Sequence, residues 1–361
     1  MRASFDSTSS TTRNAFGAYP FPVLSIRTIC AGLLVLIPLV VSLFVKDTAH
    51  SNEIPKAVGA NACAECHTKE TTIWKNTRHH QTFREMPRSK KAHEIGRKLG
   101  IKRIKADPLC LGCHFTKQDK RGAIRVTAGI SCESCHGAAQ NWIKLHSEFS
   151  GKPNKKAETA SEAAQRWKQS VALGMIRKDD MYGVAKNCYG CHVVPNEELV
   201  NVGGHPAGSP FELVSWSQGQ VRHNVWYNNG KQNALASTKR RRLMYLVGLT
   251  VELETALRAI AVATKFKGYA IRMAHRADKA RKAMLDAAKR LPDIPELGSI
   301  VEDAHEAGLK LNNKKVLMAA ADKVAATGKA LSARYDGGKL AAIDPLIPGK
   351  SKYVGEPSDS N

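Results

Sequence analysis

Few residues of this 361-residue chain are aromatic, at 6% of the total, and the apolar–polar alternation typical of strands is sparse. This scarcity excludes a sandwich or barrel built from many strands. No catalytic triad or phosphate-binding glycine loop is visible either. The fold class that remains is mainly α, and clues to function must come from other features.

Cysteine is nearly absent outside one repeated pattern. Eight of the nine cysteines lie in four Cys-x-x-Cys-His motifs, and the ninth, Cys30, lies in a hydrophobic run where we expect it to pack as an apolar side chain. The motifs comprise Cys63, Cys66 and His67; Cys110, Cys113 and His114; Cys132, Cys135 and His136; and Cys188, Cys191 and His192.

This spacing is the attachment signature of c-type haem. Two thiols bond to the porphyrin, and the adjacent histidine binds the iron as the proximal ligand. Paired cysteines also build zinc sites and disulfides, but neither explains a histidine after every second cysteine. We therefore expect four covalently bound haems, whose flat apolar surfaces replace part of the missing aromatic core.

The only long hydrophobic run covers residues 28–45, and its eighteen uncharged residues are just enough to cross a bilayer as a helix. Arg2, Arg13 and Arg27 precede it, which keeps the N-terminus cytoplasmic and exports the rest. A cleaved signal peptide is the competing interpretation. Both place the motifs on the periplasmic side, either on the inner membrane or as a soluble protein.

Composition divides the chain into six segments. We expect a cytoplasmic tail over 1–27, an anchor or signal over 28–45 and a linker over 46–60, all ahead of the motifs. A haem domain of short helices and loops follows over 61–235. A helical bundle over 236–338 and a disordered tail over 339–361 complete the chain.

The predicted bundle has amphipathic helical spacing and holds no cysteine. Residues 239–290 contain no proline, and their apolar residues recur at helical spacing. Residues 300–311 and 314–335 predict further helices. Three or four such helices favour an antiparallel bundle that docks a partner or forms an oligomer.

Acidic residues are few: the chain has 32 Asp and Glu against 55 Lys and Arg, which gives a formal net charge of +23. Haem propionates offset only a few of these charges. The excess predicts either attraction to acidic redox proteins or anionic lipid, or a Lys-rich solvated surface. We expect no nucleic-acid partner.

The haem region resembles the tetrahaem cytochrome c-554 family, whose members carry electrons from hydroxylamine oxidation. Trp74, Thr77 and His79 match its Trp-x-x-Thr/Ser-x-His segment, and residues 132–137 with His146 match its CESCHG…His segment. The resemblance covers residues 61–191. It implies that His79 binds the third haem and His146 the first.

The chain departs from that family in three ways. It lacks the Pro-Gly after CESCHG, has no histidine between His146 and Cys188, and adds a long helical tail. It also carries Gly204-His205-Pro206 followed by Phe211-Glu212-Leu213, which resembles a segment of larger c-554-like proteins whose histidine is a distal ligand. That resemblance assigns His205 to the fourth haem.

Other histidines are weaker candidates for distal ligands. His80 is the alternative to His79, and His223 and His93 are further candidates. His93 lies upstream of the second motif and is a weak candidate for its haem. Because well-placed histidines are few and the family keeps its second haem five-coordinate, we expect an open or weakly occupied position opposite His114.

Three functions fit these features. An electron carrier needs only closely spaced haems with two histidine ligands. A reductase of nitric oxide, hydroxylamine or nitrite needs an open iron, as expected at His114. A membrane-anchored quinol dehydrogenase subunit is the third possibility.

Overall fold

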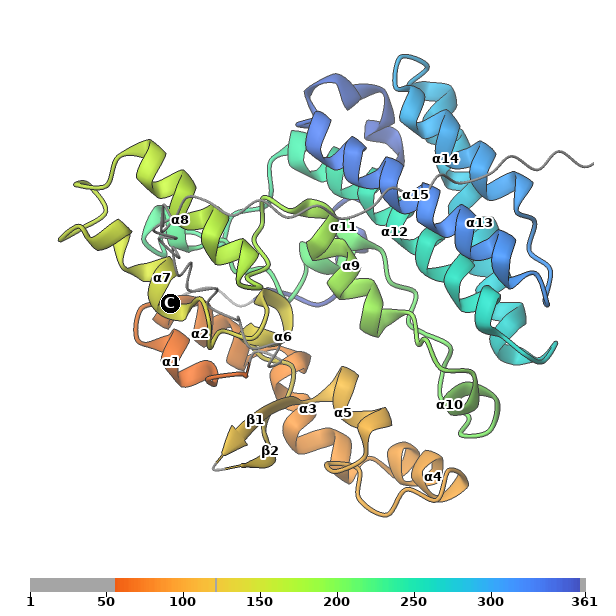
Figure 1. Cartoon of the computed structure of the whole chain (residues 1–361), viewed down its shortest axis with the longest axis horizontal. Helices are drawn as coiled ribbons and strands as arrows, with labels where there is room; N and C mark the ends of the chain where they lie inside the picture. The colour runs from red at the N-terminus through yellow and green to blue at the C-terminus, as the bar shows by residue number, and fades with distance from the viewer. Residues whose placement is uncertain (1–55, 121, 358–361) are drawn as a thin grey trace, which may run out of the picture. The chain divides into compact units, whose positions relative to one another are not determined.

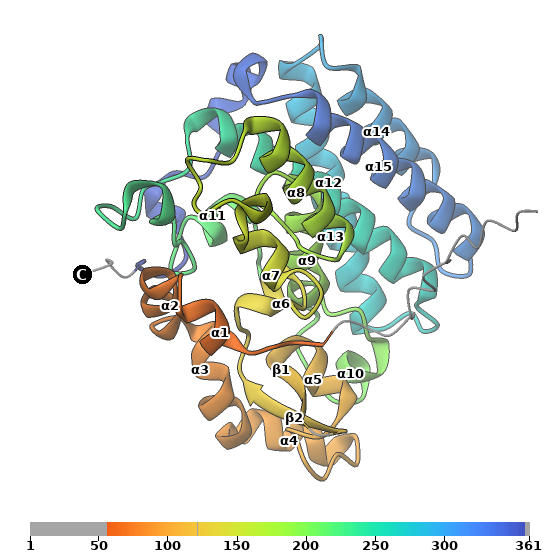
Figure 2. The ribbon, with the colours of Figure 1, turned by 60° about the vertical axis from the view of Figure 1, so that its left-hand side comes forward.

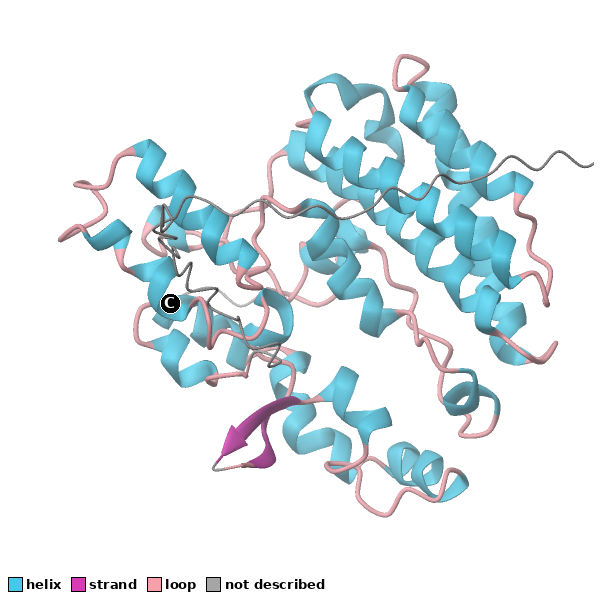
Figure 3. Ribbon diagram, viewed as in Figure 1, coloured by secondary structure: helices cyan, strands magenta, loops and turns pink. Residues whose placement is uncertain are grey.

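The computed structural model describes residues 56–120 and 122–357, and their regular structure is almost entirely helical (Figures 1 and 3). The predicted mainly α class is confirmed. The expected anchor over 28–45 lies outside the described residues. Within the described part of the chain, no helix is long and apolar enough to span a bilayer.

Short helices joined by loops make up the region of the four motifs. They are α1 (Ala60–Ala64), α2 (Thr68–Lys75), α3 (Arg78–Glu85), η1 (Met86–Arg88), α4 (Lys90–Lys98), α5 (Pro108–His114), α6 (Cys132–His136), α7 (Ile143–Ser147), η2 (Phe149–Gly151), α8 (Ala160–Ala172), α9 (Met181–His192), α10 (Glu197–Asn201), α11 (Leu213–Ser217) and η3 (Trp226–Asn228).

Local side-chain caps begin several of these helices. The Thr77 hydroxyl accepts a hydrogen bond from His80 N at the start of α3, and Asp107 caps α5 ahead of Pro108. Thr159 and Glu162 form a reciprocal capping box on α8. Each cap satisfies an amide that the first helical turn leaves without a partner.

One antiparallel hairpin links the second motif to the third. Its strands are β1 (Thr116–Lys120) and β2 (Ala123–Ala128), with an irregular register between Thr116 and Lys117. Gly122 has φ of 78°, a left-handed conformation that glycine adopts without strain. These strands have no clear signal in the sequence, because all five residues of β1 are polar and show no apolar–polar alternation.

The long helices of the second region are α12 (Thr238–Val262), α13 (Gly268–Arg290), α14 (Pro295–Glu306) and α15 (Lys314–Arg334), and they lie side by side in both views (Figures 1 and 2). Three or four helices were expected in this region, and the structure has four, because a turn at 263–267 divides the helical pattern over 239–290. The Glu197 carboxylate accepts hydrogen bonds from Thr264 and Lys265 there, and Asn201 accepts one from Tyr269 N. Contacts from α10 therefore stabilise the turn.

The bundle and the helix of the fourth motif share one hydrophobic core. Tyr182 and Tyr189 of α9 are buried in the same cluster as the apolar faces of α12 and α15. A Cβ on Gly328 of α15 would lie 2.9 Å from the Tyr182 ring and 2.5 Å from Thr250. The predicted boundary at 235/236 therefore does not separate two cores.

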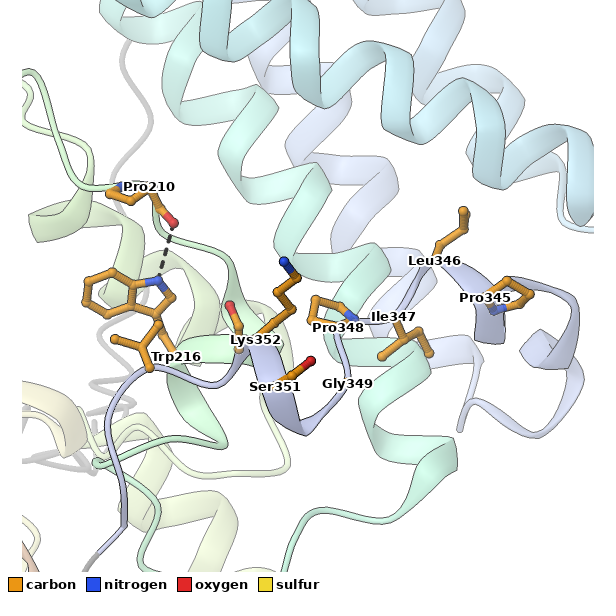
Figure 4. Close-up of a pocket in the computed structure, with 11 residues that line it drawn as sticks. Pro210, Trp216, Pro345, Leu346, Ile347, Pro348, Gly349, Ser351 and Lys352 are labelled. Atoms are coloured by element: carbon orange, nitrogen blue, oxygen red, sulfur yellow. Dashed lines mark hydrogen bonds between the residues drawn. The ribbon is translucent and has the colours of Figure 1, made fainter.

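The segment predicted to be a disordered tail contains two 3-10 helices, η4 (Gly338–Leu346) and η5 (Lys350–Lys352). Val354 donates to the Ser215 carbonyl and accepts from Gln220 N. Residues 345–349, 351 and 352 line a cavity of about 730 Å³ with Trp216, whose indole donates to the Pro210 carbonyl (Figure 4). This segment thus packs against the loop after the fourth motif.

Gly328→Val should destabilise the protein by about 1–3 kcal/mol, because the added methyls overpack the contact with Tyr182 and Thr250. Denaturant unfolding measures this change. The matched control is Gly298→Ala in α14, where a Cβ meets nothing within 4 Å. That control should be neutral or slightly stabilising, and equal losses in both variants would contradict the close packing of α15 on α9.

Candidate haem-binding sites

Each of the four motif histidines faces one other histidine ring. The ring centroids are 6.4 Å apart for His67 and His146, and 6.3 Å for His114 and His205. The remaining pairs are His136 with His223 at 6.2 Å and His192 with His79 at 6.1 Å. Eight histidines from separate parts of the haem region therefore form four pairs with nearly the same spacing.

This spacing fits one metal ion between each pair of rings. An imidazole nitrogen binds a metal ion at about 2 Å, and adding the half-width of each ring puts two such rings roughly 6 Å apart between centroids. Directly stacked aromatic rings approach more closely, as His192 and Phe211 do at 4.4 Å. The residues present thus fit a haem iron with two axial histidines.

Hydrogen bonds hold most of these rings with Nε2 turned away from the backbone. The Nδ1 atoms of His136, His205 and His223 contact the carbonyl oxygens of Ile176, Pro206 and Val221 at 2.7–3.1 Å. A carbonyl only accepts, so Nδ1 carries the proton and Nε2 keeps its lone pair for a metal. His146 Nδ1 bonds the Ile143 carbonyl, and His192 Nδ1 lies 2.8 Å from the Ser209 hydroxyl.

Burial favours the neutral form of five of these histidines. It lowers the pKa of His79, and lowers the pKa of His192 to about 4 with help from His79 and Arg276. Burial likewise lowers the pKa of His114, His136 and His146. A neutral imidazole is the form that binds a metal ion, so these environments suit ligands.

The first pairing agrees with the expected one, since His146 faces His67. The others differ from the sequence argument. His79 was expected at the third motif and faces His192 of the fourth, and His205 was expected at the fourth and faces His114 of the second. The third motif is faced by His223, a weaker candidate in the sequence.

An open position was expected opposite His114, and the structure puts the His205 ring there. The position of His205 depends on the packing of its loop against α4. A Cβ on Gly203 would lie 2.8 Å from Leu99 and 3.2 Å from Ile95. This contact with α4 holds the loop where the His205 ring reaches His114 of α5. The order of the segments in the chain does not reveal such a contact.

His80 and His93 have other surroundings. The His80 ring meets the edge of Trp74 at 4.6 Å, on a different side of α3 from His79. His93 is exposed on α4, and its Nε2 contacts the Pro87 carbonyl at 2.8 Å. Neither ring is paired with a motif histidine among the described residues.

One buried carboxylate and one buried guanidinium stabilise the segments around the sites through hydrogen bonds. Glu133, inside the third motif, accepts hydrogen bonds from the amides of Val58, Gly59 and Ala139 at 2.7–2.8 Å. Arg166, whose side chain is 4% exposed, pairs with Glu158 and donates to the His146 carbonyl. These contacts hold the N-terminal segment and the helix of His146 in position.

Neighbouring motifs touch through their thiols in an order that differs from the sequence. A hydrogen bond with Cys132 is the main cause that raises the pKa of Cys63, and a hydrogen bond with Cys191 lowers the pKa of Cys113 to about 7. Asn187, next to Cys188, donates to the Ser134 carbonyl at 2.9 Å. The four attachment sites therefore run first, third, fourth, second.

The eight motif cysteines form no disulfide. Across residues 56–120 and 122–357, no group of three or more His, Cys, Asp or Glu side chains is placed to hold a metal ion directly. The zinc and disulfide interpretations of the motifs thus find no geometry to support them, whereas the paired histidines fit haem.

A mainly helical scaffold that carries repeated Cys-x-x-Cys-His motifs with facing histidines defines a multihaem c-type cytochrome. Residues 62–137 match the family described as Cytochrome c554 and c-prime. Cytochrome c-554 of Nitrosomonas europaea is 25% identical over 143 residues, which are 37% of this chain and 57% of the relative. Residues 62–137 of this chain are thus similar to the cytochrome c554-type family.

The chain spans little more than half the length of that relative. No solved structure matches the chain. The bundle α12–α15 lies outside the residues matched by the family.

Proposed function

We propose that this protein is a periplasmic electron carrier with four haem sites, each closed by two axial histidines. The observation that carries the proposal is the pairing of every motif histidine with a second histidine ring at 6.1–6.4 Å. When bound, c-type haem supplies reversible one-electron chemistry at a potential set by its ligands and surroundings.

The protein's own residues favour transfer over catalysis. Both faces of each site are filled by imidazoles, which leaves no position for a small molecule on a metal. The distal rings are held by hydrogen bonds to their own loops, as for His205 and His223. This arrangement favours the carrier over a reductase acting at His114.

The contacts between motifs support a continuous relay. Cys63 with Cys132, Asn187 with Ser134, and Cys113 with Cys191 bring the four attachment sites together in series. The first and second motifs lie at its two ends. Electrons would then enter or leave at surfaces near His67 and near His114.

The hydrophobic run over 28–45 supports a place at the periplasmic face of the inner membrane. Cleavage of that run would leave the same relay soluble in the periplasm. The order of attachment sites is the same in either case.

Iron analysis and EPR spectroscopy of the purified oxidised protein test the proposal. We expect four irons per chain, one for each motif, and only low-spin signals, because two imidazoles give a strong ligand field. A high-spin component equal to one haem would support the reductase instead. Fewer than four irons in fully loaded protein would contradict the count.

A further inference from the structure

The end of the relay at the second motif carries a concentrated positive surface. Residues 84–105 contain nine basic and two acidic side chains, a formal net charge of +7. We define the basic face by these nine residues: Arg84, Arg88, Lys90, Lys91, Arg97, Lys98, Lys102, Arg103 and Lys105. All are exposed except Lys105, which is half-buried.

Little within the described chain compensates this charge. The ion pair recorded for the face joins Lys91 to Glu94 at 3.7 Å, on exposed side chains. Lys105 lies over the Phe83 ring, and burial together with the charge of Arg88 lowers its pKa. Two propionates of a bound haem would leave most of the +7 in place.

The basic face lies on the elements that pack with the helix of the second motif. Phe83 of α3, Ala92 of α4 and Leu111 of α5 belong to one hydrophobic cluster, and the three helices lie in the same part of the molecule in both views (Figures 1 and 2). Helix α4 also packs against the loop of His205. α5 itself presents Pro108, Leu109 and Gly112 to solvent, and a Cβ on Gly112 would meet nothing within 4 Å. An uncharged, open spot next to Cys110 and Cys113 thus follows the basic segment in the chain, with the carboxylate of Asp107 between the two.

The opposite end of the relay lacks this feature. Residues 56–75, around the first motif, contain three basic and two acidic side chains. That end exposes an aromatic side chain instead. The Trp226 ring packs on the His67 ring at a centroid distance of 4.5 Å and is 49% exposed. The two ends therefore offer different chemistry to a partner.

We propose that the basic face is the docking site for an acidic redox protein, which exchanges electrons with the protein at the second motif. This inference rests on the proposed electron-carrier function. Opposite charge speeds the encounter and orients the partner, while the uncharged spot on α5 permits close approach to the attachment site. A lipid surface suits this face less, because Leu109 is the one large apolar side chain that residues 84–114 expose, and membrane-binding surfaces insert several.

Charge reversal on the holoprotein tests the proposal. The variant carries Lys90→Glu, Lys102→Glu and Arg103→Glu, and the matched control carries Lys310→Glu, Lys314→Glu and Lys315→Glu in the bundle. Both change the net charge equally at exposed positions, and each includes the first residue of a helix. The probe is reduced flavodoxin, a small acidic electron donor, mixed with oxidised protein in a stopped-flow instrument.

We expect the bimolecular reduction rate at about 10 mM ionic strength to fall at least about tenfold in the basic-face variant and less than about twofold in the control. High salt should remove the difference. If the charge reversal prevents folding, the same three residues changed to Gln should lower the rate by a smaller factor, about threefold. Equal slowing in both triple variants, or none in either, would overturn the proposal.

Two further measurements separate the causes of failure. Deazariboflavin radical, a small uncharged reductant, should reduce the wild type, the basic-face variant and the control equally. If it does not reduce the wild type, the electron-carrier function and the docking site are both overturned. Sedimentation with phosphatidylglycerol vesicles tests the lipid. A basic-face variant that loses vesicle binding but keeps its flavodoxin rate would show a membrane surface and overturn the docking proposal alone.

Discussion

Replacing His205 with alanine should convert one of four low-spin sites into a high-spin site that binds carbon monoxide. The His205 ring stands 6.3 Å from His114, and in the described part of the chain it is the ring that faces this motif histidine. Its removal leaves a position that no neighbouring imidazole fills. EPR of the oxidised protein and titration of the reduced protein with carbon monoxide measure the change, from no binding to one molecule per chain.

His93→Ala is the matched control. His93 lies nearer to the second motif in the sequence, but it is exposed and its Nε2 contacts the Pro87 carbonyl. This variant should keep the wild-type spectrum. A high-spin signal in His93→Ala and none in His205→Ala would reverse the assignment of the distal ligand.

The proximal half of each site could be predicted from the sequence because it is local. Cysteines three residues apart lie on one side of a single helical turn, and the histidine follows directly, so α5 and α6 need no distant contact to present a motif. The cap of α8 by Thr159 and Glu162 is equally local. Patterns of this kind depend on neighbours in the chain alone.

The distal half depends on contacts between distant segments. His223 is held where Asn233 binds the backbone on both sides of it, accepting from Asn224 N and donating to the Arg222 carbonyl. His205 reaches the second motif through α4, about a hundred residues earlier in the chain. The resemblance assigned His205 to the fourth haem, and His223 was a candidate with no assigned haem, because chain order does not encode which loop crosses which helix.

The packing of the bundle against α9 could not be predicted either, because amphipathic periodicity shows an apolar face but not its partner. Helix α12 buries residues on every side, with Tyr182 and Tyr189 of α9 in the same core. A helix that is apolar all round is a buried helix. The bundle is therefore part of what holds the fourth motif.

Glu254→Ala should destabilise the protein by about 2–3 kcal/mol, since it leaves the buried Tyr182 hydroxyl without its acceptor and the half-exposed Lys186 without its charge partner. The Glu254 side chain is 3% exposed and accepts hydrogen bonds from Lys186 and Tyr182 of α9 and from Arg258 of α12. Its loss leaves Lys186 and Tyr182 without their acceptor on the bundle side, whereas Arg258 keeps its ion pair with Asp322 of α15. Denaturant unfolding, followed by far-ultraviolet circular dichroism, measures the change against Glu302→Ala, an exposed carboxylate of α14 that should move stability by less than about 0.5 kcal/mol.

The pH dependence of that loss identifies the carboxylate as its source. Burial would raise the pKa of Glu254, but the hydrogen bonds from Lys186, Tyr182 and Arg258 outweigh it and lower the pKa. A depressed folded-state pKa stabilises the protein above the ordinary value of about 4.3 and ceases to do so as pH falls through the folded value. The gap between wild type and Glu254→Ala should therefore be full at pH 7 and shrink below about pH 4. A gap that stays constant to low pH would attribute the loss to packing alone, and the link between α9 and the bundle would then be apolar.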